Sequence, residues 1–124
     1  MKKKVELEYT VNTSPRILYN RLSTPSGLSE WFADDVLLQG KKLTFKWSNT
    51  EEQAEIIDSK RIEFIRFRWL EEQDEHYFEF KIQEDELTGD VALFVTDFAL
   101  QEEVEETIEL WDQQIADLKH SLGL

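Results

Sequence analysis

The fold of this chain follows from the stretch VEETIELWDQQIADLKHSL, residues 104–122. Its apolar side chains recur at spacings of 4, 3, 4, 3 and 4 residues, at Val104, Ile108, Trp111, Ile115, Leu118 and Leu122. This spacing predicts one amphipathic helix of about five turns with a single apolar stripe. Acidic side chains gather at its start, and Lys119 and His120 lie at its end, which suits the helix dipole. A helix with one apolar stripe must cover another layer of structure.

Alternating residues upstream of this helix predict that the other layer is a sheet. The segment Val5 to Val11 alternates between apolar and polar residues, as a half-buried strand does. Further strand-like runs, separated by turns, lie within residues 36–38, 43–47, 51–59, 62–69, 77–82 and 91–100. The alternation slips between Phe64 and Ile65, which predicts either a β-bulge or a stretch buried on both faces.

Two short helices are expected between the first strand and these runs, at residues 15–22 and 28–32. Ser14 followed by Pro15 is a typical helix start. The order predicts an α+β domain in which a curved antiparallel sheet of about six to seven strands wraps round the long C-terminal helix.

Length and composition limit the function classes. The 124 residues fit a single domain, residues 1–124, with a net charge of −13 and no cysteine. An acidic chain repels nucleic-acid phosphates and anionic membranes, so neither is an expected partner. No apolar run is long enough for a membrane span, and MKKKVELEYTV does not resemble a signal peptide, so a cytoplasmic location is expected.

The negative charge is concentrated in one part of the sequence. Residues 71–112 carry 16 acidic side chains and a single basic one, Lys81. Such a segment is typical of a solvated surface, and the alternative is a docking face for a basic protein partner. A cation site is a third possibility, although no Asp-x-Asp-x-Asp-Gly motif supports it.

No residue pattern points to catalysis, a cofactor or a metal. The two histidines, His76 and His120, look exposed and lack a neighbouring nucleophile or an HExxH-type spacing. The four glycines are too scattered for a phosphate-binding loop. Asp97 interrupts an apolar run, so it either forms an ion pair on the outer face or orients a ligand. Arg66 and Arg68 are expected to pair with acids across the sheet.

The order of elements and several local motifs resemble the START-like (SRPBCC) superfamily, which includes Bet v 1-like allergens, polyketide cyclases and activators of the ninety-kilodalton heat-shock chaperone. The activator branch is matched by a Pro-started helix at Pro15 and by a short helix ending in Trp31-Phe32. It is also matched by Phe45-Lys46-Trp47, Glu55-Ile56 through Arg61-Ile62 to Phe64, Phe67-Arg68-Trp69, Thr96-Asp97-Phe98 and Trp111-x-x-x-Ile115-x-x-Leu118. Leu110 replaces the glycine that usually precedes the tryptophan.

This resemblance implies a helix-grip fold with an apolar pocket between the sheet and the C-terminal helix. Trp31 and Phe32 are expected at its rim, and Asp97 is the expected polar contact. The expected lining residues are Phe45, Trp47, Phe80, Phe94, Ile108 and Trp111. The implied function is binding of a hydrophobic small molecule or lipid, unless bulky side chains fill the space. The alternatives are a co-chaperone-like interaction module that uses the acidic segment, or a cyclase or hydrolase of the same fold.

Overall fold

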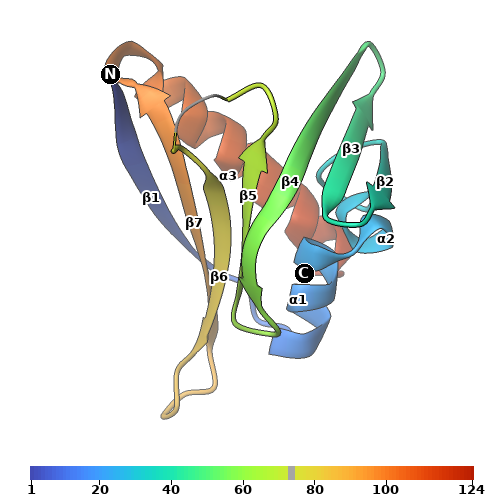
Figure 1. Ribbon diagram of the computed structural model, residues 1–124. Helices are drawn as coiled ribbons and strands as arrows, with labels where there is room; N and C mark the ends of the chain where they lie inside the picture. Colours follow the sequence, from blue (N-terminus) through green and yellow to red (C-terminus); the bar gives the residue numbers. More distant parts are fainter. Residues whose placement is uncertain (73–74) are drawn as a thin grey trace.

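One antiparallel sheet forms the first layer of the protein (Figure 1). The structure is a computed structural model and describes residues 1–72 and 75–124. Within those residues the sheet has seven strands in the order β1-β7-β6-β5-β4-β3-β2. The strands are β1 (Lys2–Thr10), β2 (Asp35–Gln39), β3 (Lys42–Trp47), β4 (Thr50–Lys60), β5 (Phe64–Trp69), β6 (Phe78–Glu84) and β7 (Val91–Leu100). The predicted antiparallel sheet is therefore confirmed.

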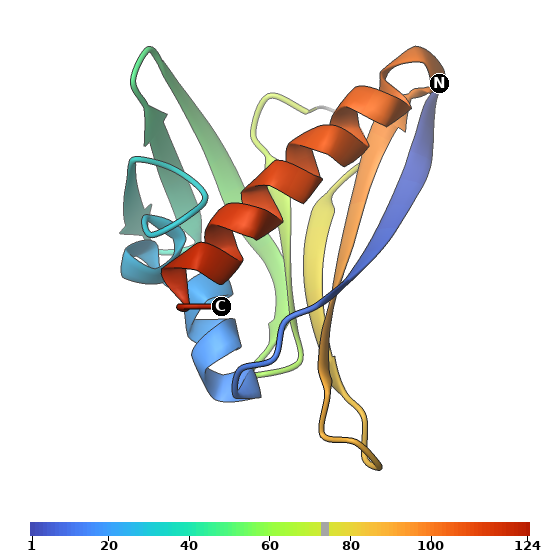
Figure 2. The same ribbon diagram turned by 180° about the vertical axis from the view of Figure 1, so that it is seen from behind.

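A single long helix, α3 (Val104–Ser121), forms the second layer and crosses one face of the sheet diagonally (Figure 2). A short 3-10 helix, η1 (Gln101–Glu103), leads into it from β7. Trp111, Ile115 and Leu118 are its buried residues, so the predicted apolar stripe does face the sheet. The hydroxyl of Tyr9 on β1 donates a 2.8 Å hydrogen bond to Asp112, which ties the helix to the edge of the sheet.

Two short helices, α1 (Pro15–Ser23) and α2 (Pro25–Leu28), follow β1. The predicted start of α1 is confirmed, because the Ser14 hydroxyl accepts a 3.1 Å hydrogen bond from the amide of Ile17. The second helix lies earlier than the predicted residues 28–32. Thr24 caps it by accepting a 2.9 Å bond from the amide of Gly27. A threonine before a proline thus starts a helix here, and Trp31 and Phe32 follow that helix in a turn.

The irregularity predicted between Phe64 and Ile65 lies on the neighbouring strand. β5 pairs with β6 in continuous register, whereas the pairing of β4 with β5 shifts between Ile56 and Asp58. The extra residue, Ile57, is 37 % exposed. The slip in the sequence pattern of β5 instead reflects partial burial of Phe64, which faces away from the fully packed side of the sheet.

Candidate functional site

Aromatic side chains fill the space between the sheet and α3. Phe32 lies at the centre of this aromatic cluster and is 5 % exposed. Six rings lie with their centroids 4.9–6.5 Å from that of Phe32, namely Trp31, Phe45, Trp47, Trp69, Phe78 and Trp111. Phe67 and Phe80 extend the cluster across β5 and β6. Ring pairs at these distances are favourable, so the cluster stabilises the fold as well as shaping the interior.

Trp31 and Phe32, which were predicted at the rim of a pocket, are more deeply buried than side chains at a pocket rim. Trp31 is 7 % exposed, and its indole N–H donates a 2.8 Å hydrogen bond to the carbonyl of Arg21. The indole N–H of Trp47 donates a 3.0 Å bond to the carbonyl of Phe32. These two bonds fasten the segment that follows α2 to α1 on one side and to β3 on the other.

The predicted lining residues separate into two groups. Phe45, Phe80 and Trp111 are buried in the aromatic cluster, and Trp47 is half-buried at its edge. Ile108 is half-buried on α3. The placement predicted for Phe94 is wrong, because this ring lies on the opposite face of β7, in a shallow depression with Lys4, Arg66, Tyr77 and Lys81.

The other face of the sheet holds the ion pairs expected of the two arginines on β5. Arg66 lies 2.8 Å from Glu79 and stacks over the ring of Tyr77, with 4.2 Å between the guanidinium carbon and the ring centroid. Arg68 lies 3.7 Å from Glu55. Asp97 takes no part in these pairs, because alternation along β7 turns its side chain toward α3.

An open groove, the α3 groove, lies between the segment Ser29–Asp34 and the exposed side of α3. Its volume is about 700 Å³. It is lined by Ser29, Glu30, Trp31, Phe32, Ala33, Asp34, Trp47, Leu110, Gln113, Gln114, Asp117, His120 and Ser121. Leu110 is 59 % exposed and borders this groove. Three rings of the aromatic cluster, Trp31, Phe32 and Trp47, reach this groove, and His120 is exposed there as expected.

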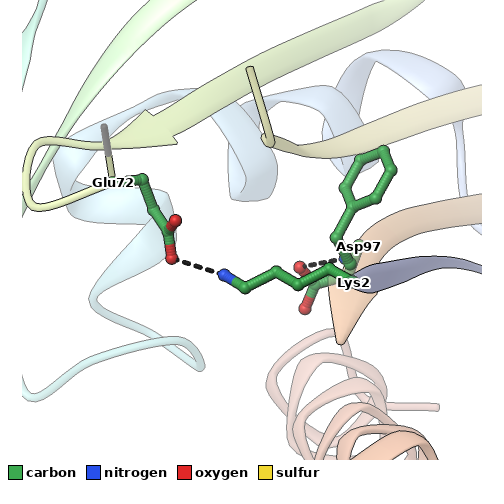
Figure 3. Close-up of polar contacts among 4 residues, drawn as sticks. Lys2, Glu72 and Asp97 are labelled. Atoms are coloured by element: carbon green, nitrogen blue, oxygen red, sulfur yellow. Dashed lines mark hydrogen bonds and ion pairs between the residues drawn. The ribbon is translucent and has the colours of Figure 1, made fainter. Parts of the chain in front are cut away.

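A small polar pocket, the Asp97 pocket, lies beside the start of β1, the end of β5 and β7. Figure 3 shows how Lys2, Glu72 and Asp97 lie there. Lys2, Trp69, Glu72, His76, Tyr77, Asp97 and Phe98 line its volume of about 160 Å³. Lys2 and Glu72 form an ion pair of 2.7 Å across it. One carboxylate oxygen of Asp97 accepts a 2.9 Å bond from the indole N–H of Trp111, and the other accepts a 2.7 Å bond from the amide of Phe98. Asp97 therefore fixes α3 against β7, and both of its oxygens are engaged by protein donors.

His76 lies in the same pocket and is more buried than the sequence suggested. Its ring packs against that of Phe98 at 4.7 Å between centroids. Its Nδ1 is shielded from solvent. Sequence reasoning missed this placement because polar neighbours in sequence, such as Glu75, give no sign of a tertiary aromatic contact.

The pKa of Asp97 gives a first testable prediction. Burial raises this pKa above its ordinary value of 3.8, and the bonds from Trp111 and Phe98 only partly oppose that effect. Between the unfolded and the folded pKa, the folded chain binds more protons than the unfolded chain. The contribution of Asp97 to the free energy of unfolding is therefore fully present below the unfolded pKa and is lost as pH rises through the folded pKa.

Urea unfolding of the wild type and Asp97→Asn between about pH 4 and 7 tests this expectation. The free energy of unfolding of the wild type, relative to the variant, should fall as pH rises. Asp58→Asn removes an exposed carboxylate and serves as the control. A wild-type advantage over Asp97→Asn that grows with pH would contradict the assignment.

Two groups of the acidic side chains in residues 71–112 lie at different ends of the sheet. Glu84, Asp85, Glu86 and Asp90 lie at the β6–β7 turn. Those of residues 102–109 lie in η1 and the first turns of α3, at the opposite end of the molecule (Figure 1). Because β7 carries the chain from one end of the sheet to the other, these two groups lie apart, and the docking face for a basic partner stays an alternative prediction.

The described residues contain neither a metal-binding cluster nor a membrane-spanning helix. No group of three or more His, Asp or Glu side chains in residues 1–72 and 75–124 is arranged to hold a metal ion. Across the same residues, no helix has the length and apolar character needed to cross a membrane.

Comparison with known proteins now identifies the family. The START-like superfamily domain matches residues 1–124, and no curated protein matches. The protein BfR322 from Bacteroides fragilis, solved by NMR, is 44% identical with a TM-score of 0.72, and the alignment covers 99% of this chain and 93% of that one.

Two more distant structures share the fold. The Aha1 dimer from Colwellia psychrerythraea is 15% identical with a TM-score of 0.82, covering 97% of this chain and 96% of that one. The AHSA1-like protein from Aeromonas hydrophila is 9% identical with a TM-score of 0.76, covering 98% and 92%. Sequence identities this low show only that the fold is shared, whereas the family match covers residues 1–124. The chain therefore belongs to the START-like superfamily.

Proposed function

We propose that this START-like domain binds a hydrophobic small molecule or lipid between the sheet and α3, entering through the α3 groove. The observation that carries the proposal is the meeting of the aromatic cluster with this groove at Trp31, Phe32 and Trp47. A volume of about 700 Å³ lies within the range of small-molecule sites, which are lined by aromatic side chains with a few polar groups.

The charges around the α3 groove narrow the ligand class. Glu30, Asp34 and Asp117 line it, and no lysine or arginine does. Carboxylates repel an anion, so a neutral or cationic apolar molecule fits better than a fatty acid. Gln113 and Gln114 supply both hydrogen-bond donors and acceptors for orientation.

Deeper binding requires the aromatic cluster to move. The rings around Phe32 already occupy the space behind the groove, so a bulky ligand must displace Phe32 or Trp31. Displacement of Trp31 breaks its bond to Arg21. Ligand binding is therefore expected to perturb tryptophan fluorescence.

Leu110→Gln tests the groove without touching the core. Because Leu110 is 59 % exposed and forms part of the apolar wall, its loss should weaken binding of the neutral dye Nile red roughly fivefold while leaving the fold intact. The measurement is a fluorescence titration of the dye, with thermal unfolding to verify stability.

Leu87→Gln is the matched control, since Leu87 is 96 % exposed at the β6–β7 turn, far from α3. It should bind the dye as the wild type does. Equal loss in both variants, or no saturable dye uptake by the wild type, would overturn the proposal.

The two alternative functions have weaker structural support. A co-chaperone-like module would use the acidic segment, in which the acids of the β6–β7 turn and those at the start of α3 lie at different ends of the sheet. A cyclase or hydrolase would need free buried polar groups, whereas the carboxylate of Asp97 already bonds to Trp111 and Phe98. The cytoplasmic location expected from the N-terminal sequence stays a prediction.

A further inference from the structure

A second groove, the α1 groove, lies between α1 and the hairpin that joins β4 to β5, beside the lower ends of those strands in Figure 1. Its volume is about 660 Å³, similar to that of the α3 groove. It is lined by Arg16, Tyr19, Asn20, Ser23, Thr24, Ile56, Ser59, Arg61, Ile62 and Ile65. Neither the expected ligand-binding residues nor the proposed function involves any of these side chains.

The charge of the α1 groove is opposite to that of the chain. The protein has 27 acidic and 14 basic side chains, yet no aspartate or glutamate in the described part of the chain lines this groove. Two arginines do, Arg16 from the first turn of α1 and Arg61 from the β4–β5 turn. Because the chain as a whole carries a net charge of −13, two arginines without a neighbouring acid mark a place where an anion is locally favoured.

These two arginines are not used to hold the fold together. The other three arginines are engaged: Arg66 with Glu79, Arg68 with Glu55, and Arg21 with the carbonyl of Ser121. Within residues 1–72 and 75–124, neither Arg16 nor Arg61 forms an ion pair. The nearest acid in sequence to Arg61 on the turn, Glu63, is instead paired with Lys60 at 2.8 Å.

The polar groups beside Arg61 belong to the same groove. Burial raises the pKa of the Tyr19 hydroxyl, while Ser59 and the positive charge of Arg61 act in the opposite direction. The guanidinium therefore lies close enough to the hydroxyl to influence it. The Tyr19 hydroxyl itself donates a 3.5 Å hydrogen bond to the carbonyl of Phe64, so the two arginines are the groups that supply donors to an anion.

The turn that carries Arg61 is strained. Ile62 has a φ of 68°, a left-handed conformation that a β-branched residue rarely adopts. The strain places a half-buried isoleucine in the groove next to Arg61. Strained residues of this kind persist where the surrounding structure holds them, and they are enriched at binding sites. Together with Ile56 and Ile65, Ile62 gives the groove an apolar wall.

We propose that the α1 groove binds an amphiphilic anion, a carboxylate or phosphate monoester attached to an apolar chain. Arg16 and Arg61 would hold the charged head, since the planar guanidinium donates two parallel hydrogen bonds to either group. Ile56, Ile62 and Ile65 would contact the chain. This site differs from the α3 groove in position and in the sign of its charge, so the two ligand classes are different.

NMR titration of the ¹⁵N-labelled protein with decanoate and with decyl phosphate tests the proposal, because each amide reports its own position. Both probes should shift amides of α1 and of residues 56–65, and their relative affinity identifies the preferred head group. Decanol, which lacks the charge, and acetate, which lacks the chain, should each bind at least about tenfold more weakly.

The double variant Arg16→Gln/Arg61→Gln should bind decanoate about tenfold more weakly, as expected for the loss of two exposed ion pairs. Both side chains are exposed, so the variant should fold as the wild type does. Arg68→Gln removes an arginine outside the groove and should leave decanoate binding unchanged.

Three results would overturn the proposal: equal decanoate affinity in the double variant, equal affinity for decanol and decanoate, or shifts confined to residues 29–34 and 110–121. The double variant should keep its Nile red binding, and Leu110→Gln should keep its decanoate binding. Failure of this site and failure of the α3 groove are therefore separate outcomes.

Discussion

Replacing Phe32 with alanine is expected to lower the free energy of unfolding by about 3–5 kcal/mol. Phe32 is 5 % exposed and touches six aromatic rings from α2–β2, the sheet and α3. Removing the ring leaves a cavity whose walls come from different elements and cannot all close inward. Loss of that much stability is a large part of the total for a domain of this size.

Urea unfolding followed by tryptophan fluorescence measures this change. Leu37→Ala is the control, because Leu37 is 49 % exposed on the edge strand β2 and should change stability by no more than about 0.5 kcal/mol. Phe32→Leu should lie between the two, since it keeps part of the volume. A Phe32→Ala variant as stable as Leu37→Ala would show that Phe32 is not the centre of the packed interior.

Phe32→Ala also tests whether Phe32 restricts ligand binding in addition to stabilising the fold. If Phe32 blocks the way from the α3 groove to the interior, folded Phe32→Ala should accept Nile red with higher affinity than the wild type does. An apolar cavity of this kind can hold a ring-sized molecule. Lower affinity in the folded variant would mean instead that Phe32 forms part of the ligand-contacting wall.

The periodic segments could be predicted from the sequence because the spacing of apolar residues within each segment determines which of its side chains are buried. The alternation at Val5 to Val11 and the helical stripe of residues 104–122 each expose one face to solvent, so the pattern reports the face directly. Those two elements and the short turns between the strands were sufficient to predict a sheet covered by one helix.

For strand β7, the sequence pattern could not predict which face of the sheet each side chain occupies. It is apolar on both faces, so its sequence does not reveal that Phe94 faces away from α3 while Asp97 faces toward it. The bond from Trp111 to Asp97 depends on the angle at which α3 crosses the sheet, and no sequence spacing encodes that angle. Apolar runs therefore predicted a core but assigned one of its members to the wrong face.

Charge placement was unpredictable for a similar reason. Sequence counts grouped the acids of residues 71–112, but the sheet places those of the β6–β7 turn and those at the start of α3 at opposite ends. Conversely, Arg16 and Arg61 are 45 positions apart in sequence and are brought to one groove only because α1 packs beside the β4–β5 turn. Surface sites built from two distant segments require the fold before they can be recognised.

Gly27→Ala is expected to destabilise the protein by about 3 kcal/mol or to prevent folding, although alanine is the better helix former. A Cβ atom on Gly27 would overlap the carbonyl oxygen of Asn20 and lie 2.7 Å from the Cα of Arg21. Both obstacles are backbone atoms of α1, so neither can rotate away. The two helices would have to separate.

Ser26→Ala provides the matched control, because it introduces the same residue one position earlier, on the exposed side of α2. It should change the free energy of unfolding by no more than about 0.5 kcal/mol. Separation of α1 and α2 would also move the segment Ser29–Asp34, which the Trp31–Arg21 bond fastens to α1. Any Gly27→Ala protein that folds should therefore bind Nile red more weakly, whereas Ser26→Ala should not. Wild-type stability and dye binding in Gly27→Ala would show that the close approach of these helices does not position the α3 groove.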